Sequence, residues 1–236
     1  VLSRYLLMNA PDAIFALHAP TEMAQVAKAQ IRFAFEQLLC YQIAVREMKS
    51  LKKEGRAMDI LPRAEANFWS MMPFTPTNAQ KRTLTEVVAD MRKPLAMARM
   101  VQGDVGCGKT AIAFGAIRLT MQAGYQSALM APTEILARQH YESAKRLLEP
   151  MGVRCGLFLG GMGIKERRAA LTAIASGEWQ AVIGTHALIG DGVTYDNLGL
   201  CITDEQHRFG VEQRTRLVRK AGDVPPDLLV MSATPI

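Results

Sequence analysis

A phosphate-binding motif over residues 103–110 constrains the fold of this chain more than any other feature. Its sequence, GDVGCGKT, satisfies the pattern G-x-x-x-x-G-K-[ST] and lies between an apolar stretch and a helix-like stretch. Glycine has no Cβ, so the backbone can turn its N–H groups around a phosphate at the helix start, where the helix dipole favours negative charge. The motif predicts a strand, loop and helix that bind a nucleotide; an ordinary glycine-rich turn is the alternative.

The residues of this motif have separate expected roles. We expect Lys109 to reach the β- and γ-phosphates of ATP, and the hydroxyl of Thr110 to ligate Mg²⁺. Cys107 occupies a variable position and is expected to be only a small residue with an accessible thiol. The residues expected to hold the nucleotide here are Gly103, Asp104, Val105, Gly106, Cys107, Gly108, Lys109 and Thr110.

From Thr77 onward, short apolar stretches alternate with amphipathic stretches, which predicts an α/β fold with a parallel sheet covered on both faces by helices. The predicted strands are residues 96–101, 126–131, 154–159, 180–184, 200–203 and 228–232. The predicted helices are residues 78–91, 109–123, 134–149, 164–176 and 211–220.

The sequence before this alternation has a different pattern. Residues 21–53 contain no glycine or proline and place apolar side chains near helical spacing, which predicts one long helix. Its last turns hold a basic run from Arg46 to Arg56, which is either a solvated face or a DNA phosphate contact. Residues 55–76, which include three prolines, are predicted to be a connector. We therefore expect a helical linker over residues 1–60 and a nucleotide-binding domain over residues 61–236.

Two consecutive carboxylates follow the predicted strand at residues 200–203. A phosphate-binding loop needs a carboxylate at the end of a neighbouring strand to hold the metal and to polarise the attacking water. Asp204 is expected to be the Mg²⁺ partner, and Glu205 to be the base for the hydrolytic water. An acidic pair after a strand can also be a helix cap, so this prediction depends on the phosphate-binding motif upstream.

Composition narrows the possible partners. The formal charge of +6 favours polyanions without identifying one. The four cysteines are widely spaced and form no metal-binding pattern, which is typical of free thiols in a reducing cytoplasm. No apolar run approaches the length of a membrane span, so no membrane association is expected.

The run DEQHRFGV at residues 204–211 resembles motif II of the RecG family of superfamily 2 helicases. Other stretches agree in order with that family: APTEILARQH at residues 131–140 is similar to motif Ia, GTHAL at 184–188 to a family segment, and SATP at 232–235 to motif III. Phe74, Thr77 and Gln80 resemble the adenine-recognising Q motif. The similarity runs from residue 74 to the end of the chain, and the helix before it resembles the family's link between a DNA-binding wedge and the motor.

The resemblance implies a RecA-like P-loop NTPase domain, preceded by a long helix, that uses ATP and Mg²⁺. It implies that Gln80 recognises the adenine edge, with Thr77 beside it, and that Phe74 stacks on the base. Gln80 can instead be an ordinary polar residue in the first turns of a helix, and Phe74 can instead be a core residue.

The resemblance also implies a set of residues that face the DNA backbone: Pro132, Thr133, Arg138, Gly184, Thr185 and His186. Arg138 can instead be a surface charge, and His186 a satisfied loop histidine. The residues implied to couple the nucleotide to DNA are Gln206, His207, Ser232 and Thr234. A strand-terminal turn is the alternative for the last two of these.

The implied function is an ATP-driven DNA helicase or translocase motor that remodels branched DNA, such as stalled forks and Holliday junctions, and also contacts single-stranded DNA. The alternatives are a transcription-repair coupling translocase and a nucleotide-gated DNA-binding module. Because the chain runs from Val1 to Ile236, directly after motif III, we expect a segment of a longer cytoplasmic protein. A wedge and a second RecA-like domain are then the expected partners, and this segment alone is expected to bind ATP and DNA without unwinding.

Overall fold

The computed structural model describes residues 5, 7–50, 54–204, 216–222 and 224–233, with only the backbone described for residues 43–50. Glu205, Gln206, His207 and Thr234 lie outside the described residues, as does part of the predicted helix at 211–220. The chain divides into two compact units, Val1–Lys52 and Lys53–Ile236. The predicted domain boundary between residues 60 and 61 stays a prediction.

The first unit contains two helices, α1 (Ala10–His18) and α2 (Met23–Ser50). The long helix predicted over residues 21–53 is α2, whereas α1 was not predicted. The side chain of Asn9 caps α1 by accepting a hydrogen bond from the Asp12 backbone N–H. Small residues on both helices, including Ala13 and Ala29, form their buried contact. No helix in the described part of the chain is long and apolar enough to cross a membrane.

The second unit is built on a six-stranded sheet in which every strand pair is parallel. The strand order is β1-β6-β5-β2-β4-β3. The strands are β1 (Ala98–Gln102), β2 (Gln126–Met130), β3 (Cys155–Phe158), β4 (Ala181–Gly184), β5 (Leu198–Asp204) and β6 (Asp227–Ser232). All six predicted strands are present, with small shifts at their ends.

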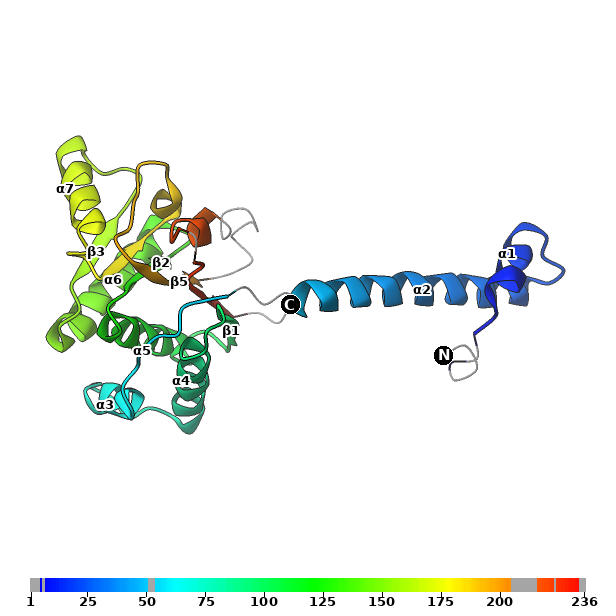
Figure 1. The fold of residues 1–236 in the computed structure, drawn as a ribbon, viewed down its shortest axis with the longest axis horizontal. Helices are drawn as coiled ribbons and strands as arrows, with labels where there is room; N and C mark the ends of the chain where they lie inside the picture. The colour runs from blue at the N-terminus through cyan, green and yellow to red at the C-terminus, as the bar shows by residue number, and fades with distance from the viewer. Residues whose placement is uncertain (1–4, 6, 51–53, 205–215, 223, 234–236) are drawn as a thin grey trace. The chain divides into compact units, whose positions relative to one another are not determined.

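Helices connect these strands and cover both faces of the sheet (Figure 1). The helices are α3 (Ala64–Ser70), α4 (Asn78–Met91), α5 (Lys109–Gln122), α6 (Glu134–Leu148) and α7 (Ile164–Ala175), with short 3₁₀ turns at Glu149–Met151 and His186–Ile189. Residues 216–219 are also helical. Because parallel crossovers are right-handed, this strand order places α5 and α6 on one face and α7 on the other.

Alternate strand residues supply the two cores on either side of the sheet. Leu129 and Ile183 belong to the larger cluster, which also contains buried residues of α4, α5 and α6. Their neighbours Ala128 and Val182 belong to a second cluster with buried residues of α7. This two-residue period confirms the predicted parallel sheet covered on both faces.

The predicted connector at residues 55–76 was wrong in one respect, because it contains α3. This helix packs on α4 and α5 (Figure 1). Phe68 of α3 is fully buried against Gly115 of α5, where an added Cβ would lie 2.9 Å from the phenyl ring. The glycine thus lets α3 approach α5 closely. A seven-residue helix bounded by prolines carries too little periodic signal to be predicted, and its stability comes from this tertiary contact.

Arg56 anchors the segment that precedes α3. Its guanidinium donates hydrogen bonds to the side-chain oxygen of Asn197 and to the carbonyls of Leu198 and Ala221, and it lies over the ring of Tyr125. For Arg56, the structure therefore supports neither of the two alternatives given for the basic run. The guanidinium instead binds the segment before α3 to the start of β5 and to the loop before β6.

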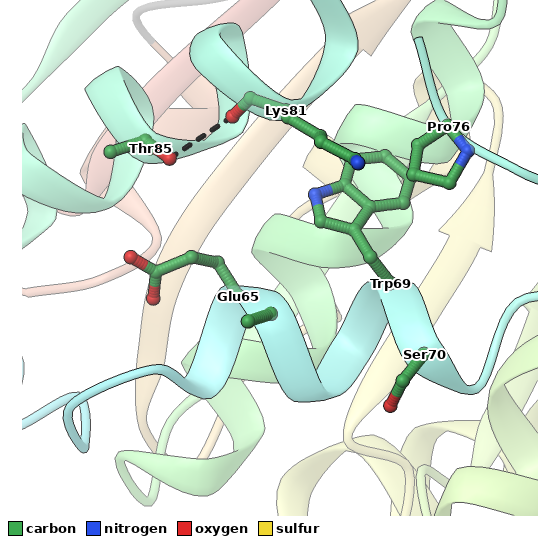
Figure 2. Close-up of a pocket in the computed structure, with 7 residues that line it drawn as sticks. Glu65, Trp69, Ser70, Pro76, Lys81 and Thr85 are labelled. Atoms are coloured by element: carbon green, nitrogen blue, oxygen red, sulfur yellow. Dashed lines mark hydrogen bonds between the residues drawn. The ribbon is translucent and has the colours of Figure 1, made fainter. Parts of the chain in front are cut away.

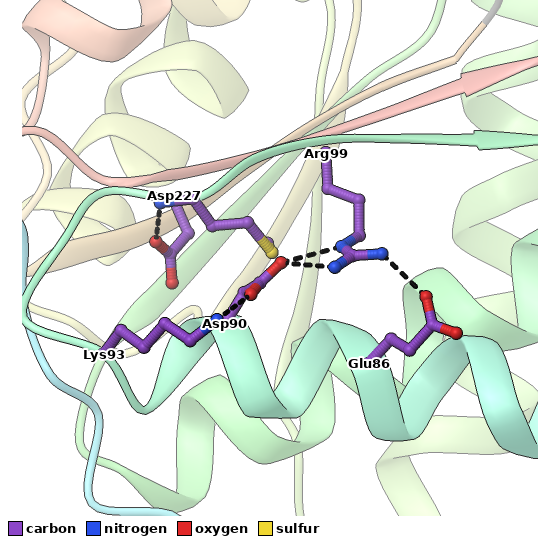
Figure 3. Close-up of polar contacts among 6 residues, drawn as sticks. Glu86, Asp90, Lys93, Arg99 and Asp227 are labelled. Carbon is purple, nitrogen blue, oxygen red and sulfur yellow. Dashed lines mark hydrogen bonds and ion pairs between the residues drawn. The ribbon is translucent and has the colours of Figure 1, made fainter. Parts of the chain in front are cut away.

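Ion pairs fasten the edge strand β1 to α4 (Figure 3). Arg99 of β1 donates to the carboxylates of Asp90 and Glu86, and Lys93 donates to Asp90. Burial alone would raise the pKa of Asp90, but hydrogen bonds from Lys93 and Arg99 outweigh it and lower that pKa. Since β1 leads directly into the phosphate-binding loop, these contacts hold the base of that loop in place.

Candidate active site

The carboxyl ends of the strands gather the predicted site residues at one edge of the sheet. Gln102, the last residue of β1, pairs in register with Ser232 of β6, and Asp204 of β5 pairs with Met231 of β6. The backbone N–H of Gly103 donates to the carbonyl of Ser232. The phosphate-binding loop, the predicted metal carboxylate and the start of the predicted motif III therefore share this edge, where open α/β sheets bind ligands.

The loop between β1 and α5 has the conformation that a phosphate site requires. Gly106 and Gly108 have φ angles of 80° and 87°, in the left-handed region that favours glycine. Gly108 is the N-cap of α5 and offers no side-chain acceptor, so the first N–H groups of this helix have no side-chain partner. A phosphate oxygen would satisfy these donors, and the helix dipole would favour its charge.

Lys109 lies against the loop that it follows. Its Nζ donates to the backbone carbonyls of Gly103 and Asp104, at 2.6 and 2.8 Å. Of the remaining predicted loop residues, Val105 is 90% exposed and Cys107 is an exposed free thiol. The ammonium is thus placed at the loop that would surround a phosphate, and the donors present here fit the phosphates of a nucleotide.

A capping box connects the start of α4 to the same loop. The Thr77 hydroxyl accepts from the Gln80 backbone N–H, and the Gln80 side-chain oxygen accepts from the Thr77 N–H. Nε2 of Gln80 donates to the carbonyl of Cys107. An amide side chain has two N–H groups and two oxygen lone pairs, so Gln80 keeps one of each for a ligand.

A cavity of about 350 Å³ brings several predicted residues together. It is lined by Phe74, Gly108 and Thr110, and also by His140. Phe74 is 41% exposed, which excludes the alternative that it is a core residue.

His140 is a site residue that the sequence analysis missed. It lies on α6 and is buried, and its Nε2 is 2.7 Å from Oδ2 of Asp204. An ionised carboxylate only accepts hydrogen bonds, so the imidazole donates to it. The signal was present in helical spacing, because His140 shares the buried face of α6 with Ala137, Ala144 and Leu148. A polar side chain on such a face is expected to have a specific partner.

The described residues fit a magnesium site with few protein ligands. No group of three or more His, Cys, Asp or Glu side chains that could hold a metal gathers within the described ranges. Asp204 keeps part of its side chain exposed and has further interactions besides His140. Mg²⁺ retains several waters and is often bound by one or two side chains together with substrate phosphates, which suits Asp204 and Thr110.

The residues of the predicted DNA-facing set that follow β2 lie at the start of α6. Pro132 is half-buried, and Thr133 is exposed. The Thr133 hydroxyl caps α6 by accepting from the Leu136 backbone N–H. Arg138 is exposed one turn further along, near the wall of a second cavity of about 350 Å³ between α6 and α7.

The residues that follow β4 are placed differently. Gly184 is buried, and a Cβ there would lie 2.1 Å from the carbonyl oxygen of Phe158. His186 is exposed in a 3₁₀ turn. Thr185 was implied to face the DNA backbone, but its side chain is buried and its Oγ1 has no hydrogen-bond partner, so its hydroxyl does not face solvent. The turn that exposes His186 directs the neighbouring side chain inward.

The comparisons with known proteins agree with this geometry. The DEAD/DEAH box helicase family model matches residues 77–236. ATP-dependent DNA helicase RecG of Streptococcus pneumoniae is 43% identical over all of this chain and 35% of the relative. RecG of Bacillus subtilis is 43% identical over 98% of this chain and 34% of the relative. RecG of Thermotoga maritima is 40% identical over 100% of this chain and 30% of the relative.

Among solved structures, RecG bound to a three-way DNA junction superposes on this chain with a TM-score of 0.82 and 38% identity. That match covers 100% of this chain and 32% of the other. The chain thus spans about a third of the length of the relatives it matches. The family model over most of the chain, together with relatives that agree along its whole length, confirms the resemblance seen in the motifs: this chain belongs to the DEAD/DEAH box helicase family, and RecG helicases are among its relatives.

Proposed function

We propose that this chain is the ATP-binding motor domain of an ATP-dependent DNA helicase or translocase that remodels branched DNA. Membership of the helicase family indicates a nucleotide-dependent activity. The observation that carries the proposal is the joint placement at one sheet edge of the phosphate-binding loop after β1 and of Asp204 at the end of β5. Helix α5 begins with donors that a nucleotide phosphate would satisfy.

Within this proposal, ATP and Mg²⁺ are held by residues of the loop and of β5. Lys109 turns from the loop carbonyls to the β- and γ-phosphates, where its charge assists the hydrogen bonds. Thr110 and Asp204 hold the metal site. Mg²⁺, when bound, neutralises charge on the phosphates during phosphoryl transfer.

His140 acts as a positioning residue for this site. Its hydrogen bond engages Oδ2 of Asp204, which fixes the orientation of the carboxylate. Glu205 follows Asp204 in the sequence and is the proposed base that orients the hydrolytic water.

The base of the nucleotide is proposed to lie beside the start of α4. Phe74 presents its exposed ring as a stacking surface, and Gln80 offers its remaining N–H and lone pair to the adenine edge. Thr77 holds the Gln80 amide in orientation through the capping box. This arrangement selects a purine by hydrogen bonds without adding charge.

DNA is proposed to lie along the other loops of the same sheet edge. Thr133, Arg138 and His186 present exposed side chains there, and Pro132 and Gly184 shape the backbone between them. The burial of Thr185 means that its backbone, and not its hydroxyl, is the group available to a phosphate. Contacts of this kind hold the phosphate backbone without reading sequence, which suits a motor. Gln206, His207, Ser232 and Thr234 are the proposed couplers between the two ligands.

Branched DNA is the proposed substrate because a solved relative with 38% identity is RecG bound to a three-way DNA junction. The proposed partners are a wedge domain and a second RecA-like domain, since the relatives are about three times as long as this chain. The relatives are bacterial, and the proposed location is the cytoplasm, where the bacterial chromosome lies.

ATP hydrolysis by the protein that carries this chain, measured with a three-way junction, with linear duplex DNA and without DNA, tests the proposal. We expect the junction to stimulate hydrolysis most. Nucleotide binding without any DNA stimulation would contradict the proposal and favour a nucleotide-gated binding module. Equal stimulation by linear duplex and junction would favour the other alternative, a transcription-repair coupling translocase.

A further inference from the structure

Two cavities are lined in part by the segment that joins α3 to α4, and one of the two reaches the phosphate-binding loop. The larger, of about 440 Å³, lies between α3 and the first turns of α4, with Trp69 and Lys81 in its walls (Figure 2). Its lining contains no residue of the loop and none of α5. The smaller, of about 350 Å³, is lined by Phe74 and by Gly108 of the loop. A nucleotide whose phosphates lie on the loop is therefore continuous with the smaller cavity.

Helix α6 supplies a wall of the smaller cavity. His140 marks the end of this wall that lies beside the metal carboxylate, because its imidazole contacts Asp204. Arg146 follows two turns later, about 9 Å further along the helix axis at 1.5 Å per residue. The wall thus extends from the metal site over a length comparable with that of a nucleoside. The residues of α6 that line the cavity lie on one face of the helix and are Gln139, His140, Ser143, Arg146 and Leu147.

Arg146 presents an exposed guanidinium to this cavity. Within the described part of the chain, the guanidinium forms no hydrogen bond or ion pair, not even with Glu142, one turn earlier on the same helix. Arg56 and Arg99, by contrast, are held by several acceptors each. Because Arg146 is exposed and has no partner of its own, a ligand in the cavity can reach it.

We propose that Arg146 stacks on the base of the bound nucleotide, so that the base lies between this guanidinium and the ring of Phe74. The inference rests on the proposed function and extends it, because it assigns a direct contact with the base to α6. A guanidinium is planar and packs on aromatic faces, and the Phe74 ring is 41% exposed in the same cavity. The volume of the cavity lies within the range of small-molecule sites.

Stacking on both faces of the base has a consequence for specificity. Every base has a π face, so contacts with Arg146 and Phe74 add affinity for any nucleotide without reading the edge of the base. The choice between adenine and guanine then depends on Gln80, whose amide is placed at the start of α4. Arg146 and Gln80 should therefore have separable effects on binding.

The test compares MgADP, MgGDP and Mg-pyrophosphate by calorimetry on the whole chain. Arg146→Ala should weaken the binding of MgADP and of MgGDP by the same factor, about fivefold or more, and so leave the ratio of the two affinities unchanged. Pyrophosphate has no base, so its affinity should not change. Melting temperatures identify any variant that fails to fold.

Further variants separate stacking from charge. Arg146→Lys keeps the charge and loses the plane, whereas Arg146→Phe keeps a flat surface and loses the charge, so the phenylalanine variant should bind MgADP more tightly than the lysine variant. Lys145→Ala removes a neighbouring exposed cation that does not line the cavity. Lys81→Ala removes a cation from the larger cavity (Figure 2). Both of these control variants should bind MgADP as the unchanged chain does.

Three results would each overturn the proposal. The first is an unchanged MgADP affinity in Arg146→Ala, and if Lys81→Ala weakened MgADP instead, the base would lie in the larger cavity. The second is an equal loss of pyrophosphate affinity in Arg146→Ala, which would place the arginine on the phosphates. The third is full MgADP affinity in Arg146→Lys. The proposed function would survive each of them if pyrophosphate binds the unchanged chain and not Lys109→Ala, whereas no binding of MgADP or pyrophosphate would overturn both.

Discussion

The imidazole Nε2 of His140 lies 2.7 Å from the carboxylate Oδ2 of Asp204, so α6 holds the acidic residue that ends β5. Helix α6 begins at Glu134 and is capped by Thr133, a residue of the predicted DNA-facing set. A single helix therefore carries both a predicted DNA contact and the partner of the predicted metal ligand. A shift of this helix on DNA binding would reach Asp204 directly.

Replacing His140 should weaken metal binding more than nucleotide binding. His140→Ala removes the hydrogen bond that orients Asp204, and the loss of such a partner costs about tenfold or more in metal affinity. The measurement is the Mg²⁺ concentration that gives half-maximal binding of a fluorescent ADP analogue. Nucleotide binding without Mg²⁺ should not change.

Two amide variants control for lost packing. His140→Gln extends an N–H to the position of Nε2 and should restore most of the metal affinity, whereas His140→Asn is too short to do so. Equal Mg²⁺ dependence in all three variants would show that His140 has only a structural role.

Replacing Gln80 should separate helix capping from base recognition. Gln80→Ala removes the reciprocal capping bond and the hydrogen bond to Cys107, so we expect a loss of about 1 kcal/mol in the free energy of unfolding together with a loss of preference for ADP over GDP. Gln80→Glu keeps an acceptor for the Thr77 N–H but has no donor for the Cys107 carbonyl or for a base, so it should lose the preference with a smaller loss of stability than Gln80→Ala. An unchanged ratio of ADP to GDP affinity in both variants would remove Gln80 from the nucleotide site.

Asp227 should give the stability of the chain an unusual pH dependence. Burial raises the pKa of this carboxyl from 3.8 to about 6, although the Met97 backbone N–H, which donates to it, acts in the opposite direction. The folded state therefore holds the proton more tightly than the unfolded state, and stability from this group falls as the pH rises from about 4 to 6. The slope is at most about 1.4 kcal/mol per pH unit.

Asp227→Asn should remove this slope, as measured by urea denaturation at several pH values. Asp59→Asn makes the same chemical change at an exposed position and should leave the slope in place. Asp90 contributes with the opposite sign, because its pKa is lower in the folded chain than in the unfolded chain. Its contribution to stability is fully present at pH values above its ordinary pKa and is lost only as the pH falls below that value. An identical slope with and without Asp227 would mean that the carboxyl titrates as it does in the unfolded chain.

Glu205→Gln should separate binding from turnover in the protein that carries this chain. The amide keeps the shape of the side chain and removes the base, so we expect unchanged MgATP affinity and a turnover at least about 100-fold lower. Steady-state hydrolysis and equilibrium binding of the same preparation check this. A normal turnover would assign the base to another residue.

The regular elements could be predicted from the sequence because local signals and tertiary structure agree in them. Helix α4 begins at Asn78, after the cap at Thr77, and ends at Met91, as predicted, since its capping box and its apolar spacing indicate the same bounds. The short helix α3 could not be predicted, because its stability depends on Phe68 reaching Gly115, far along the chain.

Within the candidate site, the sequence predicted the positions of backbone features better than the roles of individual side chains. The glycines of the phosphate-binding loop adopt the expected left-handed conformation. The direction of a side chain depends on neighbours distant in sequence, so the burial of Thr185 and the partner of His140 were not predicted. Arg56 is a third example, since its three hydrogen-bond acceptors lie about 140 or more residues away.

Binding of MgADP, measured by calorimetry on the unchanged chain and on Lys109→Ala, tests the central claim most directly. In this structure the Lys109 ammonium donates only to groups of the loop, namely the carbonyls of Gly103 and Asp104 and the sulfur of Cys107, so its removal should leave the fold intact, as the melting temperature will show. Loss of its charge-assisted contact to phosphate should weaken binding by at least about tenfold, whereas Lys145→Ala, an exposed lysine on α6, should bind as the unchanged chain does. Equal MgADP affinity in a folded Lys109→Ala variant, or no binding by the unchanged chain, would contradict the assignment of this loop as the nucleotide site.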